Sequence, residues 1–208
     1  AIKKALIRRE FKHFTSVSTW MLNGGFGLLL LPIGAVVLLI KSQGIQQLLP
    51  VIGAELPQWL EALPALFAMC LCLILSVNAI LPVSVSMEGK SLWILQSLPL
   101  APWDILNAKE RMCVQISSYP ALFFILVGGI ILKFKWWEIL LICLTVYIFI
   151  WMISDFGLFL NLKKPNMNWT NAASLTKQSM PVVINMFAGW AFCFVLAIAG
   201  FFLTKLVP

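Results

Sequence analysis

The stretch ALPALFAMCLCLILSVNAILPVSVSM, residues 62–87, decides the fold class of this chain. It runs for 26 residues without a charged side chain, and a second charge-free run of 21 residues follows at 112–132. An α-helix needs about 20 apolar residues to cross the hydrocarbon core of a bilayer. Further apolar runs bring the expected number of transmembrane helices to five; they cover residues 19–40, 139–162 and 180–204.

The composition agrees with a membrane protein. Hydrophobic residues make up 61% of the chain and charged residues 11%, whereas soluble domains have about 45–50% and 25%. Backbone polar groups in lipid must be satisfied within the segment, so the spans are predicted to be helices in an all-α polytopic fold. The 208 residues leave no room for a separate soluble catalytic domain. The odd number of spans and the alanine at position 1 predict that the chain is a fragment or processed product, with a sixth helix beyond residue 208.

Lysine and arginine predict the orientation. With the N-terminus in the cytoplasm, four of the 15 basic residues lie outside, namely Lys41, Lys133, Lys135 and Lys205. The other eleven lie in residues 1–18 and in the connections at 88–111 and 163–177, as the positive-inside rule requires. Because the positive charges are spread over several connections, no nucleic-acid-binding face is predicted.

Residues 1–18 are predicted to form a basic amphipathic helix in the headgroup region, and residues 19–208 the transmembrane domain. An apolar row and a basic row lie on neighbouring faces of this helix: Ile7, Phe11 and Phe14 against Lys4, Arg8 and Lys12. Two interpretations remain open, a connecting helix that carries force from a partner and a plain positive-inside anchor. His13 is the only histidine and cannot build a metal or catalytic site alone.

No catalytic motif is found. Gly89-Lys90-Ser91 resembles the end of a phosphate-binding loop, but the required first glycine is replaced by Ser84, so the chain is not expected to bind ATP. The five cysteines all fall inside predicted spans, which predicts no disulfide and no metal site. Asp155 is the only acid inside a span; we expect it near the membrane surface, within reach of water, Lys163 or Lys164. An intramembrane enzyme would need converging ionisable residues there.

The connection at 88–111, EGKSLWILQSLPLAPWDILNAKER, separates the second and third spans. A short helix is predicted from Ser91 to Leu98, and Pro99 ends it because proline disfavours helical geometry in the preceding residue. Pro102 begins a second helix that continues into the third span. The spacing alone supports a docking site for a partner and an idle solvated loop equally.

Three stretches in order along the chain resemble type-2 ABC exporter permeases, and most closely the second half of the long ABC exporter permeases of Gram-positive bacteria. They are LIRREFKHFTSVSTWMLNGGFG (6–27), EGKSLWILQSLPLAPWDILNAK (88–109) and NLKKPNMNWTNAASLTKQSM (161–180). The chain departs from the family pattern at Ala101, where a serine usually caps the second helix, and at Ala172, where a glutamate is expected. The second departure leaves the role of residues 163–178 open.

The resemblance implies a permease subunit of an ATP-driven exporter in a bacterial plasma membrane. Its partners would be a cytosolic ABC ATPase that holds ATP and magnesium, membrane lipid, and another permease half or copy. The coupling loop would contact the ATPase through Glu88, Gly89, Lys90, Leu92, Trp93, Leu95, Leu98 and Pro99. The connecting helix would use Lys4, Ile7, Arg8, Phe11, Lys12 and Phe14. The alternative from a different class is a non-transporting membrane anchor or regulatory subunit that tethers a cytosolic enzyme.

Overall fold

The structure is a computed structural model that describes residues 2–55 and 57–206, with side chains except at 57–59 and 199–206. It is 86% helical, and none of the described residues forms a strand, which confirms the all-α prediction. In chain order the helices are α1 (Ile2–Ser16), α2 (Ser18–Gly24), α3 (Phe26–Ile40), α4 (Ser42–Glu55), α5 (Pro57–Ser76), the 3-10 helices η1 (Leu81–Val83) and η2 (Ser86–Ser91), α6 (Leu92–Gln96), α7 (Pro102–Ile131), α8 (Trp136–Lys163), α9 (Ala172–Gln178) and α10 (Met180–Leu206).

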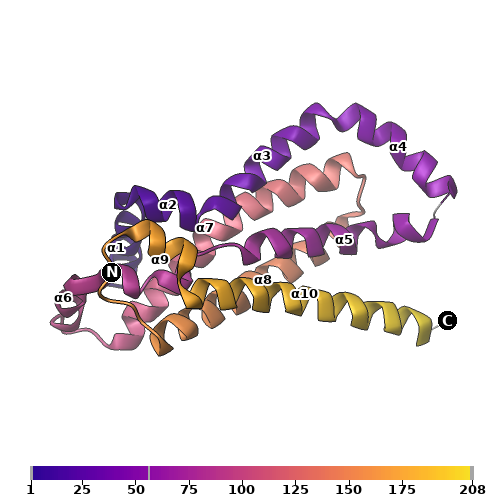
Figure 1. Cartoon of the computed structure of the whole chain (residues 1–208). Coiled ribbons are helices and arrows are strands. Elements are labelled where there is room, and N and C mark those ends of the chain that lie inside the picture. Colours follow the sequence, from indigo (N-terminus) through magenta and orange to yellow (C-terminus); the bar gives the residue numbers. More distant parts are fainter. Residues whose placement is uncertain (1, 56, 207–208) are drawn as a thin grey trace.

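Among the described residues, four helical stretches are long and apolar enough to cross a membrane, and they contain α5, α7, α8 and α10. The pair α2 and α3, bent by 59°, makes a fifth if it is one span. Figure 1 shows these helices running side by side between two ends. One end, here called the polar end, carries α1, η2, α6, α9 and the connection between α8 and α9. The three basic segments that were predicted to share one side of the membrane therefore do lie at one end.

The first predicted span, 19–40, is not one continuous helix. It is broken at Gly25, and the expectation of a single helix there is wrong. Gly24 and Gly27 bring this break against the end of α5, because a Cβ on Gly27 would meet the carbonyl oxygen of Ile74 at 2.9 Å. The backbone N–H of Ala79 donates to the carbonyl of Gly24 at 2.9 Å across this contact. The glycines thus allow the helix break at Gly25 to pack against the end of α5.

The second predicted span, 62–87, ends as an α-helix at Ser76, eleven residues earlier than expected. After Ser76, the backbone N–H of Ile80 donates to the Asn78 side chain at 2.9 Å in place of a helical hydrogen bond to a backbone carbonyl. Pro82 follows and has no N–H to donate. Residues 79–89 instead form buried turns inside the helix bundle. The remaining spans agree closely with prediction. Helix α7 ends one residue before the expected 132, and α8 and α10 begin and end within three residues of the expected 139–162 and 180–204.

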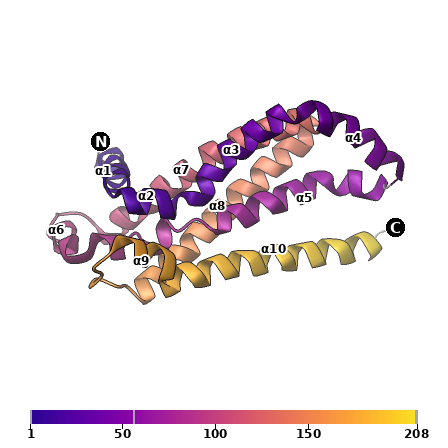
Figure 2. The ribbon, with the colours of Figure 1, turned by 45° about the horizontal axis from the view of Figure 1, so that its top comes forward.

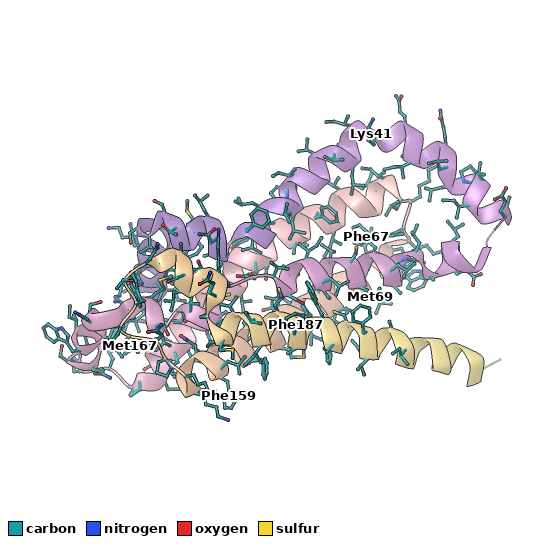
Figure 3. The ribbon with its side chains drawn as sticks, in the orientation of Figure 1. Lys41, Phe67, Met69, Phe159, Met167 and Phe187 are labelled. Carbon is teal, nitrogen blue, oxygen red and sulfur yellow. The ribbon has the colours of Figure 1, made fainter. Side chains whose placement is uncertain are left out.

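The interior is closely packed where α3, α5 and α7 meet. Phe67, labelled in Figure 3, lies on α5. Its ring stacks on Phe124 with centroids 5.3 Å apart, and Gly128 makes room for it. Outward-facing positions of α3, α8 and α10 are apolar and exposed, among them Ile33, Ile148 and Val195. Figure 2 shows α10 and α3 on opposite sides of the bundle, so apolar side chains face outward on both sides. Such a surface suits lipid as the surrounding solvent, as a multi-pass membrane protein requires.

The end opposite the polar end holds α4 and the turn between α7 and α8. Helix α4 forms in the connection between the first two predicted spans and has no buried side chain. In the short turn at 133–135 between α7 and α8, Lys133 occupies a left-handed conformation with φ of 56°. Trp136 follows with 78% of its side chain exposed, at a position typical of an interfacial aromatic residue.

Candidate partner-docking site

The segment η2–α6 and the turn that follows it form the outermost part of the polar end (Figure 1). Large apolar side chains are exposed here, with Trp93 at 65% and Trp103 at 70%. We define the tip surface as the exposed side chains of Lys90, Trp93, Ile94, Leu98 and Trp103. Exposed tryptophans are unusual on a surface that meets only water and are enriched among the residues that dominate protein interfaces. The tip surface therefore has the composition of a docking site.

Behind the tip surface lies a group of charged side chains that we call the buried ion cluster, made of Arg9, Glu10, His13, Glu88 and Lys109. The Lys109 ammonium donates to Glu10 Oε2 at 2.7 Å and to Glu88 Oε1 at 2.6 Å, and all three side chains are buried. The Arg9 guanidinium bridges the same carboxylates, at 2.5 Å to Glu10 and 3.0 Å to Glu88. The cluster thereby joins α1, η2 and α7.

The charges of the cluster balance. Two carboxylates face two cations, so the cost of removing them from water is offset only while all four remain in place. Burial lowers the pKa of His13 below its ordinary value of 6.5, and Lys109 and Arg9 act in the same direction against the attraction of Glu88 and Glu10. A neutral His13 leaves that balance undisturbed. The cluster therefore acts as a joint between its three elements, because losing one charged member leaves an unpaired charge among buried side chains.

Three members of the cluster offer metal-ligand atoms. Donor atoms of Glu10, His13 and Glu88 lie within 4.8 Å of one another. The Lys109 ammonium, however, is hydrogen-bonded to both carboxylates and balances their charge together with Arg9. A divalent cation would have to displace that ammonium and would leave excess positive charge. The geometry fits an ion-pair network better than a metal site.

A second attachment connects η2 and α6, here called the docking segment, to α8. The Asn161 side chain accepts from the backbone N–H groups of Val85 and Ser86 at 2.9 and 3.1 Å, and its amide donates to Ser86 Oγ at 2.7 Å. The Trp169 indole donates to the Ser86 carbonyl at 2.7 Å. Gly89 lies under the same indole with φ of 52°. Asn161 and Trp169 thus attach the start of the docking segment to α8 and to the connection that follows it; Trp169 belongs to residues 163–178, whose role was open.

The predicted coupling-loop residues separate into two groups. Lys90, Trp93, Leu98 and Pro99 are exposed and Leu92 is partly buried, whereas Glu88, Gly89 and Leu95 are buried within the chain. The first group is free to meet a partner. The second group supports the segment from inside.

The predicted apolar row of the N-terminal helix differs from the face that packs against the rest of the chain. Phe14 is buried and Ile7 partly so, but Phe11 is half exposed together with Lys4, Arg8 and Lys12. The face that packs inward is Leu6, Glu10 and Phe14, at i, i+4 and i+8. Phe14 also packs edge-on against Trp20 of α2. The helix is amphipathic as predicted, but its inward face centres on a charge.

Several site residues were missed by the sequence interpretation: Arg9, Glu10, Ser86, Ile94, Trp103, Lys109, Asn161 and Trp169. A signal existed for Glu10, since it is the only acid in residues 1–18 and lies between two apolar positions one turn away on either side. A carboxylate in that position needs a buried partner. Asp155, expected near the membrane surface and within reach of water, is exposed on α8. Glu110 of α7 is a neighbouring carboxyl group.

The fold and the site define an α-helical membrane protein with an aromatic surface at its polar end, attached to three helices. No family model, curated protein or solved structure matches the chain.

Proposed function

We propose that this chain is the transmembrane subunit of an ATP-driven exporter in a bacterial plasma membrane, and that its tip surface docks onto a cytosolic ABC ATPase. That partner would hold ATP and magnesium and hydrolyse the nucleotide. The observation that carries the proposal is the combination of an exposed aromatic tip with a buried ion cluster directly behind it. The resemblance of 6–27, 88–109 and 161–180 to ABC exporter permeases points to the same function.

The attachments favour transmission of force over simple adhesion. A transported substrate requires that the nucleotide state of the partner bias two arrangements of the membrane helices. Displacing the docking segment would pull on α7 and α1 through Glu88 and on α8 through Ser86. A tether for a cytosolic enzyme needs adhesion only, and a flexible loop would provide it.

The orientation follows from the same end of the molecule. Eleven of the fifteen lysines and arginines lie in the segments of the polar end, and the positive-inside rule therefore favours a cytoplasmic position for this end and for residues 1–18. A cytosolic ATPase would then meet the tip surface directly. The exposed apolar faces of the bundle would meet lipid and a second permease half or copy.

Because Glu88 is buried, docking is better tested with an exposed side chain of the tip surface. Replacing Glu88 would disturb the buried ion cluster, whereas replacing Trp93 removes exposed surface only. The test is co-expression with the ABC ATPase encoded nearest to this chain, followed by measurement of the dissociation constant in detergent. Trp93→Ala should weaken binding about 30-fold, the effect of losing an interface residue worth about 2 kcal/mol.

Trp136→Ala is the matched control, because Trp136 is similarly exposed at the opposite end. It should leave the dissociation constant unchanged. Equal binding by the wild type and Trp93→Ala would count against the docking role. In proteoliposomes the wild-type chain should also raise the ATP hydrolysis rate of its partner; binding without any such increase would instead identify a tether.

A further inference from the structure

Helix α1 presents its basic row on the side that faces away from the bundle. Lys4, Arg8 and Lys12 follow one another at intervals of four residues and are all exposed, whereas Glu10, the only acid of the helix, is buried on the packed face. Among the described residues, no carboxylate forms an ion pair with any of these three cations. The outer surface of α1 is therefore positively charged.

The buried ion cluster explains why this surface carries charge of one sign. The Lys109 ammonium of α7 donates to Glu10 at 2.7 Å, so the carboxylate of α1 is balanced inside the molecule. In the first turn, Lys3 lies 3.9 Å from Asp104 of α7, and this pair cancels at most one positive charge. The basic row keeps its full charge.

The contact between α1 and α7 places the basic row at the level of lipid headgroups. A shallow groove between the two helices is lined by Lys3 and Ile7 of α1 and by Asp104, Asn107, Ala108 and Arg111 of α7. These α7 positions, at i, i+3, i+4 and i+7, share one face, so α1 lies against the side of α7. Ala108 comes four residues before the charge-free run at 112–132, which is about 6 Å along a helix. A headgroup layer is about 5–8 Å deep on each side of the hydrocarbon core.

The outer surface of α1 also carries apolar side chains. Phe11 is half exposed and continues the line of Lys4 and Arg8 at i, i+4 and i+7, and Ile2 is exposed in the first turn. A face that mixes basic and apolar side chains is typical of helices that lie in the membrane interface. Figure 2 shows α1 at the margin of the bundle, where the surrounding bilayer would reach it.

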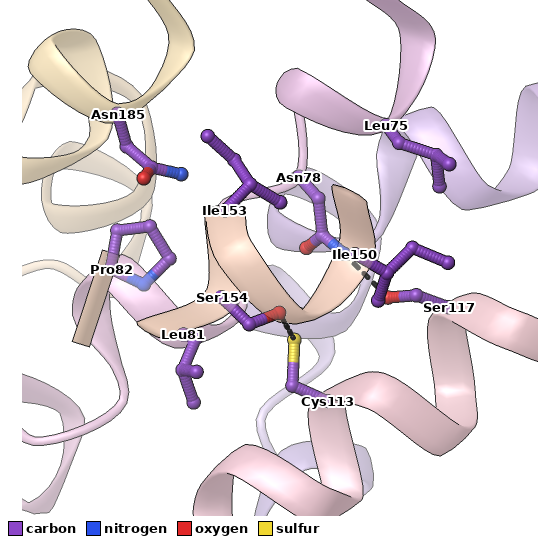
Figure 4. Close-up of a pocket in the computed structure, with 10 residues that line it drawn as sticks. All are labelled: Leu75, Asn78, Leu81, Pro82, Cys113, Ser117, Ile150, Ile153, Ser154 and Asn185. Atoms are coloured by element: carbon purple, nitrogen blue, oxygen red, sulfur yellow. Dashed lines mark hydrogen bonds between the residues drawn. The ribbon is translucent and has the colours of Figure 1, made fainter. Parts of the chain in front are cut away.

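We propose that the basic row of α1 binds the headgroups of anionic phospholipids, with Phe11 at the boundary between headgroups and acyl chains. Each lysine or arginine near an anionic membrane surface strengthens the attraction about five-fold. The lipid is bound outside the bundle, because the interior cavity where α5 ends leaves about 10 Å³ for the centre of a water molecule (Figure 4). The proposal needs only the membrane-spanning fold and does not depend on an ATPase partner.

Native mass spectrometry of the full chain in detergent tests this proposal, because it measures the dissociation constants of individual lipids. The wild type should bind phosphatidylglycerol about ten-fold or more tightly than phosphatidylcholine. Salt screens exposed charges, so this preference should shrink as the ionic strength rises from about 50 to about 500 mM. Equal constants for the two lipids, or a preference that salt leaves unchanged, would overturn the proposal without any variant.

The triple variant Lys4→Gln, Arg8→Gln, Lys12→Gln should lose most of the preference for phosphatidylglycerol. All three side chains are exposed, so its Tm in detergent should stay that of the wild type. A preference that survives in this variant would contradict the proposal. If the same variant instead bound the ABC ATPase more weakly, the basic row would be a protein interface.

A second triple variant controls for net charge. It removes the same total charge from exposed positions on three separate segments, by Lys41→Gln, Lys90→Gln and Lys177→Gln. The control should retain most of the lipid preference; an equal loss in both variants would overturn the assignment to α1. Glycerol 3-phosphate carries a phosphate without acyl chains and should not displace the lipid from the wild type. Displacement would identify a site for free phosphate and refute the lipid surface.

Discussion

Removing the ammonium group of Lys109 should destabilise the whole polar end, because this one group neutralises two buried carboxylates. In Lys109→Met the hydrocarbon stem is nearly preserved, while the bonds of 2.7 Å to Glu10 and 2.6 Å to Glu88 are lost. Arg9 remains, but its side chain is 37% exposed and already bridges both carboxylates. One excess negative charge is then left in a dry interior.

Breaking a buried ion pair by removing one partner costs about 3–5 kcal/mol. For a chain of this length that corresponds to a fall in Tm of about 6–20 °C. The assay is thermal unfolding in detergent, followed by tryptophan fluorescence. Lys90→Met is the matched control, since Lys90 is exposed in the same segment and should change the free energy of unfolding by less than about 0.5 kcal/mol.

A double variant tests whether Glu10 and Lys109 are energetically coupled. Adding Glu10→Gln to Lys109→Met removes the excess charge, so the double variant should recover a substantial part of the lost Tm. If Lys109→Met unfolds at the temperature of Lys90→Met, the cluster contributes nothing. If the costs of Glu10→Gln and Lys109→Met simply add, the two groups are not coupled, and the description of the cluster as a joint is wrong.

Two further predictions concern the same region. Because burial lowers the pKa of His13 below 6.5, the unfolded chain takes up a proton more readily than the folded one; stability should therefore be full above pH 6.5 and fall as the pH drops below it. His13→Gln should flatten that fall in a series of Tm measurements between pH 5 and 8, and parallel curves would contradict the assignment. Gly89→Ala should lower the free energy of unfolding by about 1–3 kcal/mol, since its φ of 52° and ψ of −130° strain any other residue. The control Gly44→Ala meets no atom within 4 Å and should stabilise α4 by about 0.5–1 kcal/mol, so the opposite order of the two Tm shifts would refute the strain.

The long helices were predictable because lipid imposes a simple rule on them. The runs that became α7 and α10 carry no charge for a length that matches a bilayer, the run that became α8 carries Asp155 alone, and charged or aromatic residues lie near their ends. The break between Pro99 and Pro102 was predictable for a local reason as well, since proline restricts the residue before it. In each case the signal lies within a few residues of its effect.

The helix break at Gly25, the end of α5 at Ser76 and the buried ion cluster were not predictable in this way. The end of α5 depends on the side chain of Asn78 and on the glycines of α2 and α3, which lie some fifty residues earlier. The pairing of Glu10 with Lys109 spans 99 residues, and no spacing rule connects them. The resemblance assigned Glu88 and Trp93 to the same coupling loop, and no local spacing shows that Glu88, two residues before Lys90, turns inward while Trp93 is exposed.

The separation of Glu10 and Lys109 also sets an order for biogenesis. Helix α1 is synthesised before α7, and its inward face cannot close until Lys109 has been made 99 residues later. At typical rates of about 5–20 residues per second, that interval is roughly 5–20 s. During it the amphipathic helix must wait with its carboxylate in water or at the membrane surface, while the helices of the first two spans enter the bilayer. The polar end is therefore among the last parts of this region to assemble, although α1 is synthesised before the spans that it joins.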